Sequence, residues 1–227
     1  EDNLVLRAAR LLQQTAGSGR GASITLRKGI PVAAGLGGGS SDAAATLLAL
    51  NELWGIGMSP DELMGLGATL GSDVPFFLQS SGCALATGRG ERVAPLPPAR
   101  GWWAVVLRPE VAPLANKTAT LYSMLAKKDF SDGSRVATVV ERLKAGRLAT
   151  EGLHNAFERV AGVAFPGLDA YRRVFKRAKA PFAALAGSGP ALYTLVDSAE
   201  QGRGILDALR REGHEAWMAA LIEATSD

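Results

Sequence analysis

The chain has 227 residues, 47% of them hydrophobic and 21% charged, which is typical of a globular protein with ample material for a core. Its net charge of +3 does not require a nucleic-acid partner, and its single cysteine excludes an intrachain disulfide. No cysteine and histidine cluster has metal-ligand spacing, and no apolar run approaches the roughly 20 residues that span a bilayer. These features favour a cytoplasmic protein, or one of the plastid stroma in a plastid-bearing organism.

The first half of the chain is predicted to be mainly helical. We expect helices over 4–14, 43–53 and 60–70, a strand over 24–27, and a hairpin of 83–87 with 91–96. Asp2 or Asn3 is suited to cap the first helix. Ser59 and Glu62 have the spacing of a capping box at the start of the third helix. The proline-rich stretch 95–101 is the best candidate for a linker.

The second half of the chain contains enough strands for a sheet. Strands are predicted at 102–107, 182–186, 191–196 and 215–222, and helices at 115–125, 136–144, part of 153–160, 168–179 and 199–211. Apart from additional helices, the order is strand, helix, strand, strand, helix, strand, as in ferredoxin-like domains. The sequence therefore predicts an α+β fold, with one domain over 1–100 and a second over 101–227.

The most informative stretch lies between the strand predicted at 24–27 and the helix predicted at 43–53. Residues 31–44 read Pro-Val-Ala-Ala-Gly-Leu-Gly-Gly-Gly-Ser-Ser-Asp-Ala-Ala, and four of the nine residues from 35 to 43 are glycine. Glycines let a backbone approach a ligand closely, and the free N–H groups of a helix start attract phosphate. Residues 40–42 are suited to cap such a helix. Because a sharp turn needs only one glycine, we predict a phosphate-binding loop.

The sequence of this stretch excludes two familiar phosphate-binding loops. No lysine follows the glycines, as the pattern G-x-x-x-x-G-K-[ST] requires. Ser40 stands where the dinucleotide pattern G-x-G-x-x-G has its third glycine.

Residues 31–44 resemble the second motif of the GHMP kinases, the small-molecule kinases named for galactose, homoserine, mevalonate and phosphomevalonate. The similarity extends over nearly the whole chain. It implies a two-domain GHMP kinase fold: an N-terminal ATP-binding α+β domain, here truncated, and a C-terminal ferredoxin-like βαββαβ domain. It also implies ATP and Mg²⁺ as cofactors. The string at 35–44 is similar to that of members that phosphorylate the 2-hydroxyl of 4-diphosphocytidyl-2-C-methyl-D-erythritol, a cytidine diphosphate methylerythritol of the non-mevalonate isoprenoid pathway.

The resemblance assigns the nucleotide site and a catalytic residue. The implied ATP-binding residues are Pro31, Ala33, Ala34, Gly35, Leu36, Gly37, Gly38, Gly39, Ser40 and Ser41. Asp73 lies in a Gly-Ser-Asp-Val-Pro segment like that of the family, whose aspartate is taken to be the general base toward the acceptor hydroxyl. From the residues alone, Asp73 is interpreted as a turn or capping aspartate. Asp42 and Glu52 are weaker candidates for the base.

Two other segments carry the implied acceptor site. Residues 117–122 resemble a Ser-Thr-x-x-x-Tyr/Phe segment, in which Thr118 contacts the substrate phosphates and Tyr122 stacks on cytosine. Lys117 stands where serine is usual. From the residues alone, a helix start at Thr118 and a core aromatic at Tyr122 are as well supported as these substrate contacts. Gly187, Ser188 and Gly189 resemble the third family motif, which packs beside the phosphate loop. By themselves these three residues indicate a hairpin turn.

A further segment, 153–158, resembles an Asn-Asp-Leu-Glu segment of the family, and its Asn155 and Glu158 are interpreted as structural. The family pattern opens with a strand bearing Ala/Ser-Lys-x-Asn-Leu and a nearby aromatic-histidine pair, and neither precedes Leu4. We therefore expect the N-terminal part of the pattern to be absent, and the chain alone to bind nucleotide weakly and turn over poorly.

The expected partners are ATP and the small-molecule substrate, with no nucleic acid and no membrane, and a monomer or weak homodimer. Two alternatives stay open. One is another GHMP kinase, acting on mevalonate, homoserine or a sugar. The other is a non-catalytic nucleotide-binding or RNA-binding protein on the same scaffold. Basic residues at 172–179 indicate a solvated helix face more readily than an RNA contact.

Overall fold

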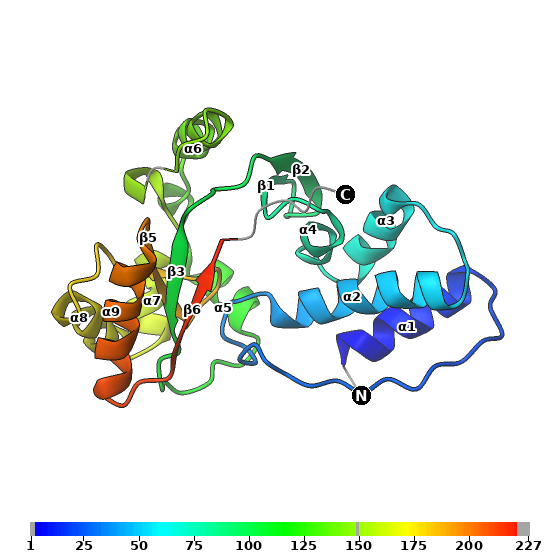
Figure 1. Ribbon diagram of the computed structural model, residues 1–227, viewed down its shortest axis with the longest axis horizontal. Helices are drawn as coiled ribbons and strands as arrows, with labels where there is room; N and C mark the ends of the chain where they lie inside the picture. The colour runs from blue at the N-terminus through cyan, green and yellow to red at the C-terminus, as the bar shows by residue number, and fades with distance from the viewer. Residues whose placement is uncertain (1–2, 149, 222–227) are drawn as a thin grey trace. The chain divides into compact units, whose positions relative to one another are not determined.

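The computed structural model describes residues 3–148 and 150–221 (Figure 1). The described residues form two compact units. Residues 3–32 and 37–97 belong to unit 1, and residues 33–36 and 98–221 belong to unit 2. The chain therefore enters unit 2 briefly at Ala33–Leu36, returns to unit 1, and leaves it again inside the predicted linker.

Unit 1 is a group of helices with one hairpin. Its elements are α1 (Leu4–Thr15), α2 (Gly38–Leu53), α3 (Pro60–Leu70), α4 (Val74–Leu78), β1 (Cys83–Thr87) and β2 (Arg92–Leu96). The two strands pair antiparallel, as predicted. Helices α1 and α2 lie side by side (Figure 1). The amphipathic α1 buries Ala8 and Leu12 in a core that also contains Leu47 and Trp54.

Two helix starts in unit 1 confirm the capping predicted from sequence. Asn3 Oδ1 accepts a hydrogen bond of 3.0 Å from the Val5 N–H, while the alternative cap, Asp2, lies outside the described residues. At α3, Ser59 Oγ accepts from the Glu62 N–H at 3.3 Å, and the Glu62 carboxylate accepts from the Ser59 N–H at 2.8 Å. That bond to the Ser59 backbone is the main reason why the pKa of Glu62 is lowered.

The strand predicted at 24–27 is not formed. None of the described residues pairs with this segment in a sheet, and a β-strand needs a hydrogen-bonded neighbour. Its alternating apolar residues Ile24 and Leu26 are 39% and 37% exposed. Alternation alone was therefore not sufficient to predict a strand.

Unit 2 is built on a four-stranded antiparallel sheet in the order β4-β5-β3-β6. The strands are β3 (Trp103–Leu107), β4 (Ala184–Leu185), β5 (Leu192–Val196) and β6 (Ala216–Ala220). The helices are α5 (Lys117–Met124), α6 (Ser134–Lys144), α7 (Glu158–Ala164), α8 (Leu168–Arg177) and α9 (Ala199–Arg211), with 3₁₀ turns at Lys127–Asp129 and Thr150–Gly152. This order confirms the ferredoxin-like prediction. The predicted end of the last strand, Ile222, lies outside the described residues.

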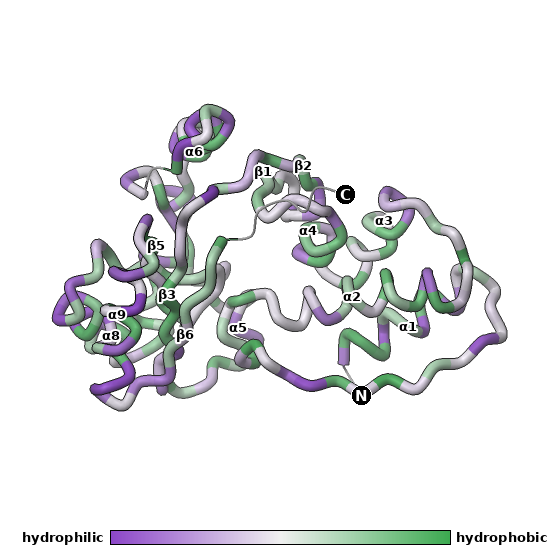
Figure 2. The backbone as a smooth tube through the Cα atoms, viewed as in Figure 1, coloured by the Kyte–Doolittle hydropathy of each residue, from purple (hydrophilic) through white to green (hydrophobic). Residues whose placement is uncertain are grey.

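The core of unit 2 joins this sheet to α7, α8 and α9. Its largest fully buried side chains include Phe165, Phe175, Leu107, Leu192 and Leu209. Figure 2 shows hydrophilic and hydrophobic residues alternating along α8 and α9, as expected for helices with one face on a core. Among the described residues, no helix is both long and apolar enough to cross a membrane.

Helix α7 begins at Glu158, inside the range predicted to contain a helix, and continues beyond that range to Ala164. Asn155 explains why the helix does not begin earlier, because its Oδ1 accepts a hydrogen bond of 3.0 Å from the Phe157 N–H. Such a side-chain turn competes with helix formation. The residues before α7 are thus held in a turn, and the amide nitrogen of Asn155 is left free to bond to Leu185 and Gly187.

Candidate functional site

The glycine-rich stretch ends at the start of α2, in unit 1. The helix begins at Gly38, with Gly37 as its N-cap at φ +69°. Residues 40–42 therefore lie inside the helix and do not cap it, which corrects the prediction. The first helical bond runs from the Ser41 N–H to the Gly37 carbonyl at 2.9 Å. The N–H groups of 38–40 have no acceptor within the helix, because they precede that first bond.

Close packing explains why glycines occupy this helix start. A Cβ placed on Gly37 would lie 2.7 Å from Cζ of Phe77 in α4, and one on Gly38 would lie 2.9 Å from Cγ2 of Ile30. Contacts this short do not occur in real structures, so a larger residue would displace its neighbours. The weaker candidate Asp42 forms an ion pair with Lys28. The glycines at this helix start thus leave room for the side chains of Phe77 and Ile30 to pack against the backbone.

Asp73 occupies the N-cap position of α4, yet its side chain makes no capping hydrogen bond. The carboxylate is exposed. Residues four apart lie on the same face of a helix, so Asp73 shares a face with Phe77, whose ring lies against Gly37. The turn between β1 and β2 also lies close to Asp73, since a Cβ on Gly90 would lie 3.9 Å from Asp73 Oδ1. A carboxylate in this position is available to a ligand.

In unit 2, the segment Ala33–Leu36 packs directly against the turn at 187–190. The Ala191 N–H donates to the Ala34 carbonyl at 3.0 Å. Gly35 has φ +83°, and a Cβ on it would lie 2.3 Å from the Ala186 carbonyl oxygen and 2.6 Å from the Gly189 nitrogen. A Cβ on Gly187 would in turn lie 2.9 Å from the Gly35 carbonyl oxygen. The structure therefore brings these two glycine segments, which are far apart in the sequence, into backbone contact.

Lys117 joins the same two segments. Its Nζ donates to the Ala33 carbonyl at 2.7 Å and also to the Gly189 carbonyl. The side chain is half-buried, and this burial lowers the pKa of the Lys117 ammonium. In the sequence, Lys117 is distinguished only as a lysine where the family segment usually has serine.

Thr118 and Tyr122 lie on the same helix, α5, in unit 2. Thr118 Oγ1 donates to Ser188 Oγ at 3.4 Å, so the two predicted substrate-contacting hydroxyls are neighbours. Tyr122 is 56% exposed and makes an edge contact with Phe157, with ring centroids 4.9 Å apart. Tyr122 is thus not a core aromatic, and much of its ring is accessible to a stacking partner.

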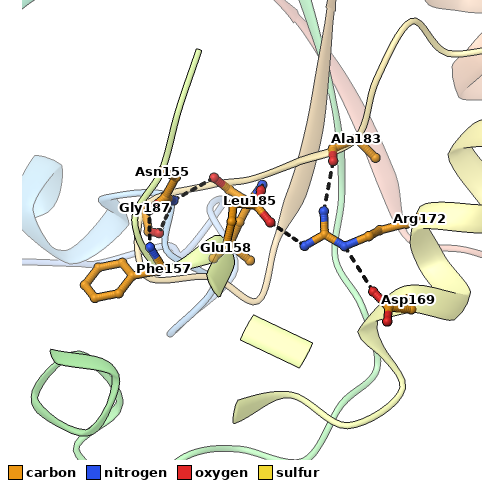
Figure 3. A network of polar contacts seen from close by, with 8 residues as sticks. All are labelled: Asn155, Phe157, Glu158, Asp169, Arg172, Ala183, Leu185 and Gly187. Atoms are coloured by element: carbon orange, nitrogen blue, oxygen red, sulfur yellow. Dashed lines mark hydrogen bonds and ion pairs between the residues drawn. The ribbon is translucent and has the colours of Figure 1, made fainter. Parts of the chain in front are cut away.

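Asn155, which lies just before α7, binds the glycine turn at 187–190. Its Nδ2 donates to the Leu185 carbonyl at 3.0 Å and to the Gly187 carbonyl at 2.7 Å. Figure 3 shows this side chain directed at the segment that carries Leu185 and Gly187. One side chain therefore satisfies two backbone carbonyls at the end of the short edge strand β4.

Glu158 and Arg172 hold β4 itself (Figure 3). Glu158 Oε1 accepts from the Leu185 N–H at 2.6 Å, and its Oε2 pairs with Arg172 Nη2 at 2.5 Å. Arg172 Nη1 also donates to the Ala183 carbonyl at 3.0 Å, and its Nε lies 3.3 Å from Asp169 Oδ1. Glu158 thus has a structural role, because it links β4 to Arg172 of α8. Arg172, expected on a solvated face, is part of a network.

Replacing Glu158 by glutamine is expected to lower the free energy of unfolding by about 1–2 kcal/mol. The amide can still accept from the Leu185 N–H, but it loses the charge that pairs with Arg172 and presents N–H groups to another donor. Urea denaturation followed by circular dichroism measures the change. Asp169→Asn is the control, since the Asp169 side chain is 71% exposed, and it should cost less than about 0.5 kcal/mol. Equal costs for the two variants would contradict the role of Glu158.

The candidate residues fall into two groups. Unit 1 holds Pro31, the glycines at 37–39, Ser40, Ser41 and Asp73, while unit 2 holds Ala33–Leu36, Thr118, Tyr122 and 187–189. Within the described residues, no group of three or more histidine, cysteine, aspartate or glutamate side chains could hold a metal ion.

Comparisons with known proteins cover both units. The family model of the GHMP kinases N terminal domain matches residues 3–81, and that of the GHMP kinases C terminal matches residues 140–215. A 4-diphosphocytidyl-2-C-methyl-D-erythritol kinase of Dehalococcoides mccartyi is 43% identical over 222 residues, which cover 98% of this chain and 78% of the relative.

Solved structures show the same relationship. The crystal structure of a 4-(cytidine 5'-diphospho)-2C-methyl-D-erythritol kinase superposes with a TM-score of 0.78 at 37% identity, covering 95% of this chain and 76% of the other. A homoserine kinase from Cytophaga hutchinsonii also reaches a TM-score of 0.78, at 22% identity over 98% of this chain and 76% of the other. The second likeness shows the fold alone, so overall shape does not distinguish the two substrates.

Proposed function

The chain belongs to the GHMP kinase family, and we propose that it transfers the γ-phosphoryl group of ATP to the 2-hydroxyl of 4-diphosphocytidyl-2-C-methyl-D-erythritol. The observation that carries this proposal is the 43% identity, over 98% of the chain, with a relative of that name. The fold and the use of ATP are common to the family. The choice of acceptor rests on the sequence similarity and on the residues of the candidate site.

The free N–H groups at the start of α2 are suited to hold the phosphates of ATP. They lie at the positive end of a 16-residue helix, and the glycines leave no Cβ between them and a ligand. In phosphoryl transfer the protein mainly positions the reactants and stabilises charge on the transferring group. Backbone amides that are fixed before the nucleotide arrives perform this task without reorganisation.

Asp73 is proposed as the general base. Its carboxylate accepts the proton of the 2-hydroxyl as that oxygen attacks the γ-phosphorus, the bond from this phosphorus to the β,γ-bridging oxygen breaks, and ADP leaves. The missing capping bond and the exposure of the side chain support this role, since neither is expected of an aspartate retained to cap α4. The products are ADP and the 2-phosphate of the acceptor.

The acceptor is proposed to lie along α5 and the glycine turn of unit 2. The neighbouring hydroxyls of Thr118 and Ser188 can donate to its diphosphate, and the exposed ring of Tyr122 can stack on its cytosine. Two of the basic residues considered for an RNA contact, Arg172 and Arg177, are paired with Glu158 and Glu212. This pairing weighs against the RNA-binding alternative.

Mg²⁺ is proposed to accompany the nucleotide. It usually binds substrate phosphates and water with only one or two protein carboxylates. The described residues offer no cage of three or more ligating side chains, so we assign the ion no ligand set in this chain. Its chemical contribution, when bound, is to neutralise phosphate charge.

A panel of acceptors tests the proposal. The chain is incubated with Mg-ATP and either 4-diphosphocytidyl-2-C-methyl-D-erythritol, its 2-deoxy analogue, mevalonate or homoserine, and ADP release is measured. We expect kcat/KM for the first to exceed that for mevalonate and homoserine by about 100-fold or more, because a site built for polar groups rejects acceptors that lack them. The 2-deoxy analogue should bind without releasing ADP. Faster reaction with mevalonate or homoserine would identify another GHMP kinase. ADP from no acceptor, both with this chain and with the same chain extended by a family-like N-terminal segment, would favour a non-catalytic nucleotide-binding protein.

A further inference from the structure

Lys117 stands at a place where a lysine is unfavourable. It is the first residue of α5, and a helix N-terminus carries partial positive charge that disfavours a cation. Its side chain is half-buried, and none of the described carboxylates lies within ion-pair distance of its Nζ. Burying an ammonium without a counter-charge is costly unless hydrogen bonds compensate. The contacts of Lys117 must therefore provide that compensation.

Those contacts are two backbone carbonyls from separate parts of the chain. Nζ donates to Ala33 in the segment Ala33–Leu36 and to Gly189 in the turn at 187–190. Hydrogen bonds from a charged donor are roughly twice as strong as neutral ones. The bond from the Ala191 N–H to the Ala34 carbonyl joins the same two segments. The ammonium thus adds two charge-assisted links to this single backbone bond.

We propose that Lys117 is a positioning residue that clamps the segment Ala33–Leu36 onto the glycine turn at 187–190, and so determines where the chain enters the start of α2. Leu36 is followed directly by Gly37, the left-handed N-cap of that helix. The amides at 38–40 follow Gly37 along the chain, so we expect them to be held less firmly when Ala33–Leu36 is released. The consequence for ATP rests on the proposed function, whereas the clamp itself rests only on the contacts above.

Lys117→Met tests the clamp, because methionine keeps an apolar stem of similar length and removes the donor. Without nucleotide, we expect hydrogen exchange at the amides of Gly189 and Ala191 to become about tenfold faster. The dissociation constant of ATP, measured by calorimetry, should rise about tenfold, since one charged hydrogen bond accounts for at least that factor. The Tm should stay within about 2 °C. Lys117→Arg should return both quantities to within about threefold of the original protein.

Lys128→Met is the matched control, since Lys128 is an exposed lysine in the same unit, and it should leave exchange and ATP affinity unchanged. Unchanged exchange at Gly189 and Ala191 in Lys117→Met would overturn the proposal. A general rise in exchange across unit 2 with a lower Tm would also overturn it, because the lysine would then act only in folding. Should the original chain bind no ATP, the proposed function fails, while the exchange measurement still decides on the clamp.

Discussion

Replacing Asp73 by asparagine is expected to lower kcat by about 10²–10⁴-fold, the range typical of a lost general base. Asparagine has nearly the same shape but cannot accept the proton of the acceptor hydroxyl. The exposed carboxylate makes no capping bond to α4, so the substitution should leave the fold unchanged. The KM for ATP should change less than about threefold, because the proposed phosphate contacts come from the start of α2. Single-turnover ADP formation at saturating substrate measures the chemical step.

Glu52→Gln is the control for Asp73→Asn. Glu52 is an exposed carboxylate in the last turn of α2 and the weaker alternative for the base, so its loss should leave kcat unchanged. A variant Asp73→Asn that retains more than about a tenth of the original kcat would exclude a general base at this position. A large loss in Glu52→Gln would move the role to that residue.

Replacing Gly35 by alanine is expected to lower the free energy of unfolding by about 2–4 kcal/mol and to abolish measurable ATP binding. Two costs combine at this position. The backbone has φ +83°, which alanine adopts only with strain, and the new Cβ would lie 2.3 Å from the Ala186 carbonyl oxygen. That neighbour is backbone, so it cannot rotate away, and the segment Ala33–Leu36 must move off the turn at 187–190.

Urea denaturation and calorimetric titration with ATP measure the two effects of Gly35→Ala. Gly29→Ala is the matched control, because a Cβ on Gly29 would have no heavy atom within 4 Å and its φ is not in the left-handed region. It should change the free energy of unfolding by less than about 0.5 kcal/mol. If Gly35→Ala were as stable as Gly29→Ala, the backbone contact between the two glycine segments would not exist in solution.

Local interactions allowed much of the fold to be predicted from the sequence. The capping box of Ser59 and Glu62 involves residues three apart, so its pattern alone places the start of α3. The hairpin of β1 and β2 is defined by a glycine-containing turn between two short apolar runs. The strand and helix order of unit 2 follows from periodicity, and α9 begins and ends at the predicted residues.

Long-range partners account for what the sequence alone left unpredicted. The segment 24–27 has the alternation of a strand but no pairing partner among the described residues. The glycines at 37–39 indicated a phosphate loop, yet the start of α2 at Gly38 depends on packing against Phe77 of α4. The pattern of a segment shows neither that a long-range partner is present nor that it is missing.

The sequence by itself determined the family resemblance, the ferredoxin-like order and the candidate residues, because motifs, caps and periodicity are properties of neighbouring residues. Only the tertiary structure decided that Gly35 touches Ala186 and Gly189, and that the carbonyls of Ala33 and Gly189 share the ammonium of Lys117. The residues in these contacts are far apart in the sequence, as in the 84-residue separation of Lys117 from Ala33 and the 72-residue separation of Lys117 from Gly189. The Gly35 contact forms because a residue without a Cβ lets two backbone segments approach. The Lys117 bonds form because the folded chain brings two carbonyls to a half-buried ammonium, which needs partners wherever the fold supplies them.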